Sequence, residues 1–333
     1  MKRLCFLVIC MSIIMGCSTS TSSTKALVDY VDPNIGTAHC RWFFYTPAAI
    51  PFGMAKLAPS TDAHLGNPGG WQAVGYDFRH TSIEGFANFH EFQVGGVVFA
   101  PTVGELQTVP GELENPDGGY RSRFDKKDEV AAPGYYSVLL KDYGVKAELT
   151  AMKRVGFHRY TYPKTEQANL IFDIGNKQGE SGEVKDAEVQ YFEDGRVEGY
   201  VITSPVYVNI YQKGADVRMY FSAVLNKKPV QVGTFVKDVV NPGKHQEKGP
   251  GAGLYMTFST EEQEAVEVKV GLSYTSIENA RFNRETEAAD VTFDQAKKNA
   301  TDVWNESLSR IYVEGGKETD KVKFYTGLFH GLL

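Results

Sequence analysis

The sequence predicts a mainly β protein, with an antiparallel two-sheet β-sandwich followed by α-helices. The first observation is a series of short segments with strand-like alternation, separated by turns such as Glu193-Asp-Gly195, at the spacing typical of sandwiches. The second is the content of 33 Gly, 18 Tyr and 20 Phe, which favours strands joined by tight turns. The expected strands cover Tyr135–Leu140, 145–162, 168–174, 187–192, 196–203, 206–212, 216–225, 230–236, 254–259 and 266–274.

The third observation is a change to helical periodicity after Ser276. Helices are expected over 277–288 and, more clearly, over 294–310, where apolar residues recur at steps of three and four. The residues that fall on one face of the second helix are Phe293, Ala296, Ala300, Val303, Trp304, Ser307, Leu308 and Ile311. A last helix is expected over 321–333, and its apolar side chains need a partner that no further residues supply. A larger helical domain is therefore expected downstream.

The first 16 residues are predicted to be a secretory signal and not part of the fold. Lys2 and Arg3 precede a short apolar run that is too short to cross a membrane. Ile14-Met-Gly-Cys17 resembles a bacterial lipobox, which predicts lipidation of Cys17 and a membrane-anchored lipoprotein, periplasmic or outer-membrane-associated. A plain signal peptide with an incidental cysteine is the alternative. Residues 17–26 are then expected to form a flexible polar tether.

Charge and cysteine usage exclude several classes of protein. The formal net charge is −6 and no basic run occurs, so a nucleic-acid partner is not expected. Of the 4 cysteines, only Cys40 belongs to the expected fold, which rules out an intrachain disulfide framework there. No Asp-x-Asp-x-Asp loop for calcium occurs in the chain.

Residues 30–104 carry most of the functional signal. The stretch mixes Gly, Pro, Trp, His, Asp and Glu with little periodicity, which is typical of loops that converge on a ligand. The aromatic run Arg41-Trp-Phe-Phe-Tyr45 fits either core packing or stacking on sugar rings.

Within and beyond this stretch, the chain resembles glycoside hydrolase family 92, the calcium-dependent inverting exo-α-mannosidases. The motifs that carry the resemblance are Val31-Asp-Pro-Asn-Ile-Gly-Thr37, Ile50-Pro-Phe-Gly-Met54, Gly70-Trp71, Gly75-Tyr76, Ile83-Glu-Gly-Phe86, Pro101-Thr-Val-Gly104, Trp304-Asn305 and Phe324-Tyr-Thr326. The resemblance covers residues 27–333 in order. It departs at Ala87-Asn-Phe-His90, where many members have a Ser-His-Thr-His-like run, and at Ala38–Tyr45.

The resemblance implies a galactose-mutarotase-like supersandwich over 27–275, linker helices over 276–316 and, from 317, the first helix of a truncated (α/α)6 catalytic barrel. It places the general acid, the general base and most calcium contacts downstream of residue 333. No catalytic residue is therefore expected in this chain. Ca²⁺ is expected in the complete enzyme and not in this fragment alone. The implied partners are a mannose-containing glycan and the missing barrel.

Four residues are the candidate substrate contacts: Trp71, His90, Glu91 and Asp62. Trp71 lies between glycine-bearing turns and is expected to stack on mannose, with a buried indole as the alternative. His90 is either a donor to a sugar hydroxyl or a structural histidine. Glu91 fits a hydroxyl ligand or a satisfied structural carboxylate, and Asp62 fits a loop brace as well as a ligand.

Three functions remain open from the sequence. The first is the substrate-shaping domain of an exo-acting α-mannosidase that hydrolyses terminal α-linked mannose, with the fragment itself inactive. The second is a stand-alone, lipid-anchored glycan-binding protein without hydrolase activity. The third is a truncated gene product without function.

Overall fold

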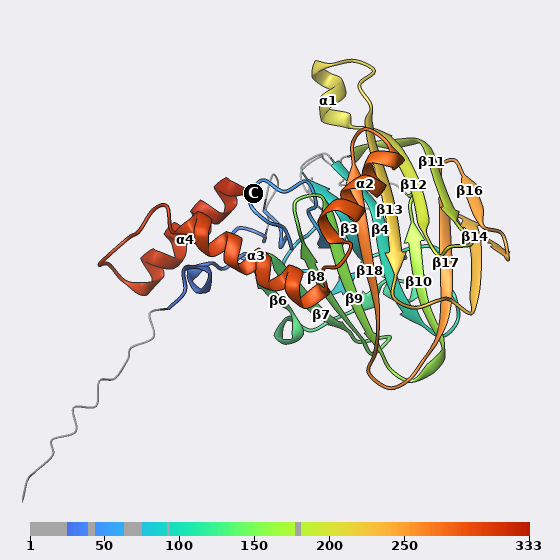
Figure 1. Cartoon of the computed structure of the whole chain (residues 1–333), viewed down its shortest axis with the longest axis horizontal. Helices are drawn as coiled ribbons and strands as arrows, with labels where there is room; N and C mark the ends of the chain where they lie inside the picture. The colour runs from blue at the N-terminus through green and yellow to red at the C-terminus, as the bar shows by residue number, and fades with distance from the viewer. Residues whose placement is uncertain (1–24, 39–43, 63–74, 92–93, 177–180) are drawn as a thin grey trace, which may run out of the picture.

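The computed structural model describes residues 25–38, 44–62, 75–91, 94–176 and 181–333. Two large antiparallel sheets face one another, and the last two helices extend to one side of them (Figure 1). The strands are β1 Ala58–Ser60, β2 Ser82–Ile83, β3 Gly85–Glu91, β4 Val94–Val103, β5 Ser122–Arg123, β6 Val130–Ala132, β7 Tyr135–Leu140, β8 Val145–Ala151, β9 Val155–Tyr162, β10 Thr165–Asp173, β11 Glu183–Tyr191, β12 Val197–Ser204, β13 Val217–Leu225, β14 Gln231–Val236, β15 Val239–Pro242, β16 Gln246–Lys248, β17 Ala252–Thr260 and β18 Glu264–Ser273.

The strand order shows how the sandwich is assembled. One sheet has the order β1-β3-β4-β10-β17-β14-β15, the other β16-β11-β12-β13-β18-β9-β8-β7-β6, and β2 pairs with β5. The inner faces meet in one apolar core, in which the rings of Phe99, Phe172 and Phe221 cluster, with the Phe99 centroid 4.1 Å from that of Phe172 and 6.5 Å from that of Phe221. The mainly β, antiparallel fold class is thereby confirmed.

One predicted strand is wrong. Residues 206–212 alternate in a β-like manner, yet Val206–Tyr211 form the short helix α1, which projects from the sandwich in Figure 1. The helix begins directly after Pro205, and the side-chain amide of Asn209 donates to the Pro205 and Ala215 carbonyls. These local hydrogen bonds stabilise a helical turn at residues 206–211, so the segment does not pair with a neighbouring strand despite its alternating sequence.

A polar chain crosses the apolar core. His158 is fully buried; its Nε2 lies 2.8 Å from Asn88 Oδ1, and its Nδ1 lies 2.8 Å from the Tyr160 hydroxyl. Asn88 donates through Nδ2 to the Val97 carbonyl, so its Oδ1 is left to accept from Nε2–H. The imidazole is thus held neutral, with Tyr160 donating to Nδ1.

Burial of His158 predicts a loss of stability in acid. Burial lowers the pKa of His158 from 6.5 to about 3, so between these values the unfolded chain binds a proton that the native protein does not. The free energy of unfolding should therefore fall as pH drops from about 6.5, by up to about 1.4 kcal/mol per pH unit for this group. Urea titrations between pH 7.5 and 4 should show a shallower pH dependence in His158→Gln than in the native chain. An unchanged slope would contradict this account.

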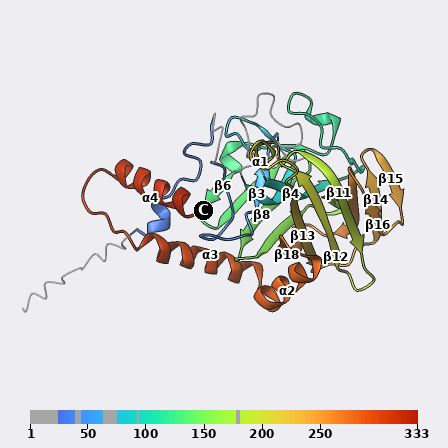
Figure 2. The same cartoon turned by 90° about the horizontal axis from the view of Figure 1, so that it is seen from above.

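The helices follow the sandwich. They are α2 Ile277–Ala288, α3 Phe293–Leu308 and α4 Glu318–Leu332, and the 3₁₀ turns are η1 Leu27–Tyr30, η2 Pro116–Gly118 and η3 Lys126–Asp128. Ser276 caps α2 by accepting from Asn279 N, and Thr292 and Gln295 form a capping box on α3. Figures 1 and 2 show α2 and α3 along the outer face of the nine-stranded sheet. The predicted helices over 277–288, 294–310 and 321–333 are confirmed within a few residues.

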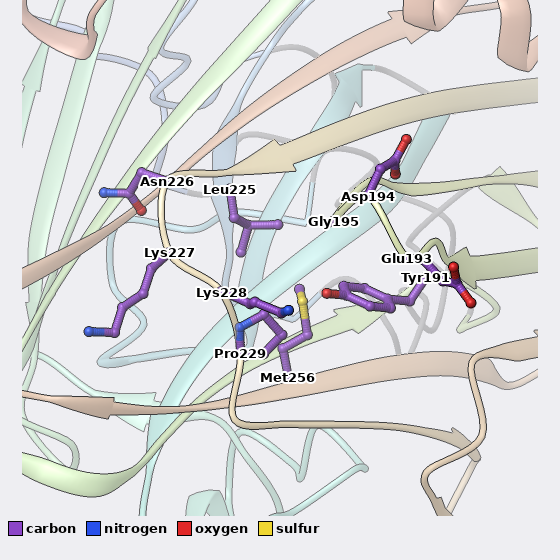
Figure 3. A pocket seen from close by; sticks show the side chains of 10 residues that line it. All are labelled: Tyr191, Glu193, Asp194, Gly195, Leu225, Asn226, Lys227, Lys228, Pro229 and Met256. Carbon is purple, nitrogen blue, oxygen red and sulfur yellow. The ribbon is translucent and has the colours of Figure 1, made fainter.

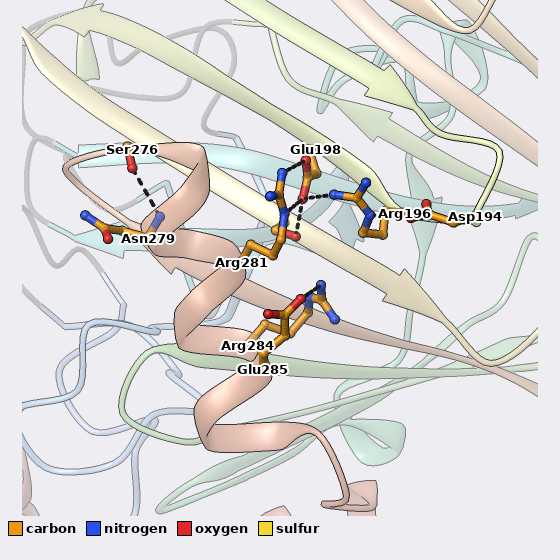
Figure 4. Close-up of polar contacts among 9 residues, drawn as sticks. Asp194, Arg196, Glu198, Ser276, Asn279, Arg281, Arg284 and Glu285 are labelled. Carbon is orange, nitrogen blue, oxygen red and sulfur yellow. Dashed lines mark hydrogen bonds and ion pairs between the residues drawn. The ribbon is translucent and has the colours of Figure 1, made fainter.

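An ion cluster and a glycine fix α2 to the sheet. The buried carboxylate of Glu198 on β12 accepts from Arg281 Nη2 at 2.6 Å, Arg196 Nη1 at 2.9 Å and Ser222 Oγ at 2.8 Å (Figure 4). Burial opposes ionisation, but the bonds from Arg281 and Ser222 hold the pKa of Glu198 below its usual value. At Gly271 on β18, a Cβ would lie 2.1 Å from the Ala280 carbonyl oxygen, so only glycine allows this close approach.

Trp304 joins the helices to the sandwich. Its indole is fully buried, donates through Nε1 to the Ala49 carbonyl at 2.7 Å, and lies 4.6 Å from the Phe329 ring. The N-terminal turn η1 completes this contact, because Val28 N donates to Asn305 Oδ1 and Asp32 N to Thr326 Oγ1.

The expectation that α4 lacks a partner within the chain needs correction. Phe329 and Tyr325 are buried against Trp304 and Leu308 of α3, with η1 packed beside them. Phe324, which is 37% exposed, is the large apolar side chain of α4 that these contacts leave uncovered. The sequence pattern identified an apolar helix but did not reveal that the N-terminal turn folds back onto it.

Candidate functional site

A pocket of about 420 Å³ lies between the sandwich and the end of α4. Its lining comes from three parts of the chain: the segment before β1, the end of β3, and the last turns of α4. The lining residues are Phe44, Tyr45, Lys56, Glu91, Gly327, His330, Gly331 and Leu333. Pockets between domains are common places for small-molecule sites because both sides supply polar groups.

An ion pair forms one wall of the pocket. Lys56, whose side chain is 9% exposed, pairs through Nζ with the carboxylate of Glu91 and donates to the Leu333 carbonyl at 2.5 Å. The Lys56 backbone is fixed by donation to the Asn88 carbonyl at 3.2 Å. An ammonium group beside a carboxylate offers donors and acceptors together, which suits the vicinal hydroxyls of a sugar.

Aromatic rings and His330 continue the wall, and His90 lies buried behind Tyr45. Tyr45 stacks on His90 with ring centroids 4.5 Å apart, and the Tyr45 hydroxyl donates to the His90 carbonyl. Phe44 lies 4.2 Å from the ring of His330, whose Nε2 is 3.3 Å from the Ile35 carbonyl. Burial lowers the pKa of His90 to about 3 and also lowers that of His330, so both rings stay uncharged at neutral pH.

A second polar cluster holds both ends of the loop between Asp62 and Gly75. The Gly75 carbonyl accepts from Thr61 N at 2.7 Å and Asp62 N at 3.2 Å. The buried guanidinium of Arg121 donates to the Thr61 carbonyl at 2.8 Å and to Glu84 at 3.2 Å. Backbone hydrogen bonds therefore join the two ends of the loop, and Arg121, the residue before β5, fixes them through the Thr61 carbonyl.

The residue that follows the loop is fixed separately. Tyr76 donates to Glu129 at 2.8 Å, and Tyr136 donates to the same carboxylate oxygen at 2.7 Å. Lys126 pairs with Glu129 and lies over the rings of Phe78 and Phe124 at 4.5 and 4.4 Å. These contacts set the direction in which the chain leaves the loop.

The structure brings only part of the predicted site together. Glu91 lines the pocket, His90 lies buried beneath Tyr45, and Asp62 sits at the base of the loop. Trp71 falls outside the described residues, as do Cys17, Cys40 and the signal segment. Sequence reasoning missed Lys56 and His330, since an isolated lysine and a histidine on a helix carry no local signal; Tyr45 was visible only as part of an aromatic run.

Two further properties concern the described part of the chain alone. There, no group of three or more His, Cys, Asp or Glu side chains is placed to hold a metal ion. Likewise, none of the helices built from the described residues combines the length and apolar character needed to span a membrane.

Comparison with known families decides the identity of the fold. The model of the glycosyl hydrolase family 92 N-terminal domain matches residues 30–273, and that of the family 92 catalytic domain matches residues 279–333. The chain belongs to glycosyl hydrolase family 92. The pocket therefore lies where the part matched by the N-terminal domain meets the part matched by the catalytic domain.

Solved structures agree with this assignment. The chain is similar to the family GH92 α-mannosidase BT3965 from Bacteroides thetaiotaomicron, with 29% identity and a TM-score of 0.83 over 93% of this chain and 41% of that one. The same protein in complex with mannoimidazole matches with 28% identity and a TM-score of 0.82, over 93% of this chain and 40% of that one. The GH92 glycosyl hydrolase ccman5 matches with 25% identity and a TM-score of 0.75, over 91% and 40%.

The chain thus spans about 41% of the length of the first of these structures. A search of curated proteins gives no match.

Proposed function

We propose that this chain is the substrate-shaping part of an inverting, exo-acting α-mannosidase, and that its pocket beside α4 binds terminal α-linked mannose. Family membership supports the α-mannosidase class. The observation that carries the site is the pairing of Lys56 with Glu91 in a pocket that α4 closes. A structurally similar family member forms a complex with mannoimidazole, which supports a mannose-shaped ligand.

The chemistry assigned to this chain is binding and orientation. Lys56 donates to one sugar hydroxyl while Glu91 accepts from its neighbour, and the neutral His330 ring supplies a further hydrogen-bonding group. Phe44 and Tyr45 offer aromatic surface to the C–H face of the ring. Such contacts hold the sugar for reaction without taking part in proton transfer.

The acid and base belong, in this proposal, to the enzyme beyond residue 333. Inversion needs two carboxyl groups roughly 6.5–9.5 Å apart with a water between them. Two carboxylates beside the 62–75 segment are already paired, Glu84 with Arg121 and Asp77 with Arg79, so both have structural roles. Calcium is likewise assigned to the complete enzyme, and no step on this chain runs through it. The 333-residue chain is expected to release no mannose.

Charge-removing variants test the site. Glu91→Gln and Lys56→Met should each weaken binding of methyl α-mannopyranoside by about tenfold or more, because hydrogen bonds to charged groups contribute roughly 1.5–3 kcal/mol. Binding is followed through the imidazole NMR signals of His330, which lines the pocket, and of His90, which stacks on the lining residue Tyr45. Glu166→Gln, on the exposed start of β10, is the matched control and should bind like the native chain. If all of these variants bound methyl α-mannopyranoside as tightly as the native chain, the assignment of the sugar site to this pocket would be overturned.

Trp71 is tested in an enzyme that includes the catalytic domain. Trp71→Ala should lower kcat/KM while leaving Tm nearly unchanged, as expected for an indole that stacks on substrate. A large drop in Tm would instead favour the buried alternative.

A further inference from the structure

A second pocket, of about 380 Å³, lies at another end of the sandwich and shares no residue with the pocket beside α4. It opens where three connections meet: the turn from β11 to β12, the segment from β13 to β14, and the adjoining part of β17. Figure 3 shows the side chains that line it, namely Tyr191, Glu193, Asp194, Gly195, Leu225, Asn226, Lys227, Lys228, Pro229 and Met256.

The walls of this pocket are held in place by bonds that do not involve the cavity itself. Asn226 donates through Nδ2 to the Ala265 carbonyl at 3.1 Å and accepts at Oδ1 from Glu267 N at 2.8 Å. On the opposite side, Arg196 pairs with Asp194 at 2.7 Å and lies 4.7 Å from the ring of Phe192. The pocket is therefore formed before any ligand arrives, which reduces the entropy lost on binding.

The charges around the pocket select a neutral ligand. Lys227 is neutralised by Glu264, and Asp194 by Arg196. Glu193 and Lys228 form no ion pair with any residue that the structure describes, and they leave one negative and one positive group at the rim. An anion would be repelled by Glu193, and a cation would be repelled by Lys228. A neutral ligand with hydroxyl groups can instead accept a hydrogen bond from Lys228 and donate one to Glu193.

The floor of the pocket is apolar and carries one free hydroxyl. Leu225 and Pro229 are its partly exposed apolar residues, Met256 lies fully buried beneath them, and the mostly buried Tyr191 ring is fixed by an edge contact with His245 at 5.5 Å. The Tyr191 hydroxyl forms no hydrogen bond with any described residue and points into the cavity in Figure 3. Burial and the nearby Asp194 raise the pKa of Tyr191, so its hydroxyl keeps its proton and remains a donor.

We propose that this pocket is a second carbohydrate site, which takes one neutral pyranose unit of a glycan. The C–H face of the sugar ring packs on the partly exposed Leu225 and Pro229, and the hydroxyls reach the Tyr191 hydroxyl, Lys228 Nζ and the Glu193 carboxylate. An apolar floor with a polar rim of mixed charge matches the two-sided character of a pyranose. The site does not depend on the function proposed for the pocket beside α4, since it uses none of that pocket's residues.

The test uses the full 333-residue chain with methyl-labelled methionine and methyl α-mannopyranoside as the probe. Met256 lies in the pocket, so its methyl signal should shift saturably with sugar concentration. Tyr191→Phe keeps the ring and should weaken the affinity read at Met256 about fivefold, as for the loss of one neutral hydrogen bond. Glu193→Gln and Lys228→Met should each weaken it further, by tenfold or more.

Three controls make the outcome decisive. Lys56→Met in the other pocket should leave the Met256 titration unchanged, so that failure of one site does not count against the other. Methyl glucuronoside, an anion, and methyl glucosaminide, a cation, should bind no more tightly than the neutral sugar. No shift at Met256, equal affinity in the Tyr191→Phe, Glu193→Gln and Lys228→Met variants, or tighter binding of either charged sugar would overturn the proposal. Circular dichroism checks that each variant is folded.

Discussion

Arg121→Met is expected to lower the free energy of unfolding by about 3–5 kcal/mol, since removing one partner of a buried ion pair leaves the other charge without compensation. Both side chains of the Arg121–Glu84 pair are almost completely buried. Arg121 also donates to Ser82 Oγ at 3.0 Å and to the Thr61 carbonyl at 2.8 Å, so the variant frees the base of the 62–75 loop as well. Urea denaturation measures the loss of stability. Titration with methyl α-mannopyranoside tests whether release of the Thr61 carbonyl also affects sugar binding, because Trp71 lies in the 62–75 segment.

Arg123, two residues along the chain, provides the matched control. Its side chain is 43% exposed, and its guanidinium pairs with Asp117 and Asp142 at the surface. Arg123→Met should therefore cost no more than about 1 kcal/mol, as exposed ion pairs do. The double variant Arg121→Met with Glu84→Leu should recover part of the lost stability, because no buried charge is then left alone. Similar losses for Arg121→Met and Arg123→Met would contradict the role given to burial.

Trp304→Ala is expected to have an effect of the same size, about 3–5 kcal/mol, because a fully buried aromatic side chain is removed from a packed contact. Trp304→Phe should cost less, since it retains a ring against Phe329 and loses chiefly the bond from Nε1 to the Ala49 carbonyl. Thermal and urea unfolding of the two variants separate packing from hydrogen bonding.

Glu306→Ala, on the exposed side of the same helix, is the control and should change the free energy of unfolding by less than about 0.5 kcal/mol. A loss for Trp304→Ala no greater than this would show that α3 is not fixed to the sandwich through its indole.

The fold was largely predictable because most strands and helices bury one face, and burial imposes a period on the sequence. Phe293, Ala296, Ala300, Trp304 and Leu308 are buried at the positions that the helical spacing predicts. Residues 206–212 show the limit of this reasoning. Alternation there does not reflect a buried strand face, and Pro205 together with Asn209 decides the local structure.

The candidate site was less predictable because its residues meet only in three dimensions. Glu91 was identified through a loop-rich composition, but Lys56 lies 35 residues earlier and carries no motif that links the two. His330 reaches the pocket from α4, through packing of the helix on η1 and α3 that no local pattern encodes. The buried role of His90 followed from its neighbour Tyr45 and was one of the two alternatives open from the sequence.

The bonds between η1 and the helices have a consequence for the order in which the chain folds on the ribosome in cell-free translation, where it is not exported. Val28 and Asp32 bind partners that lie 277 and 294 residues later in the chain. At roughly 5–20 residues per second, translation delivers those partners roughly 15–60 s after η1 has been made. The sandwich strands can pair during this interval, whereas Leu27, Val28 and Tyr30 stay without their apolar neighbours. The first turn of the folded protein is thus among the last to reach its place, and nascent chains stalled before residue 305 should expose it to proteases.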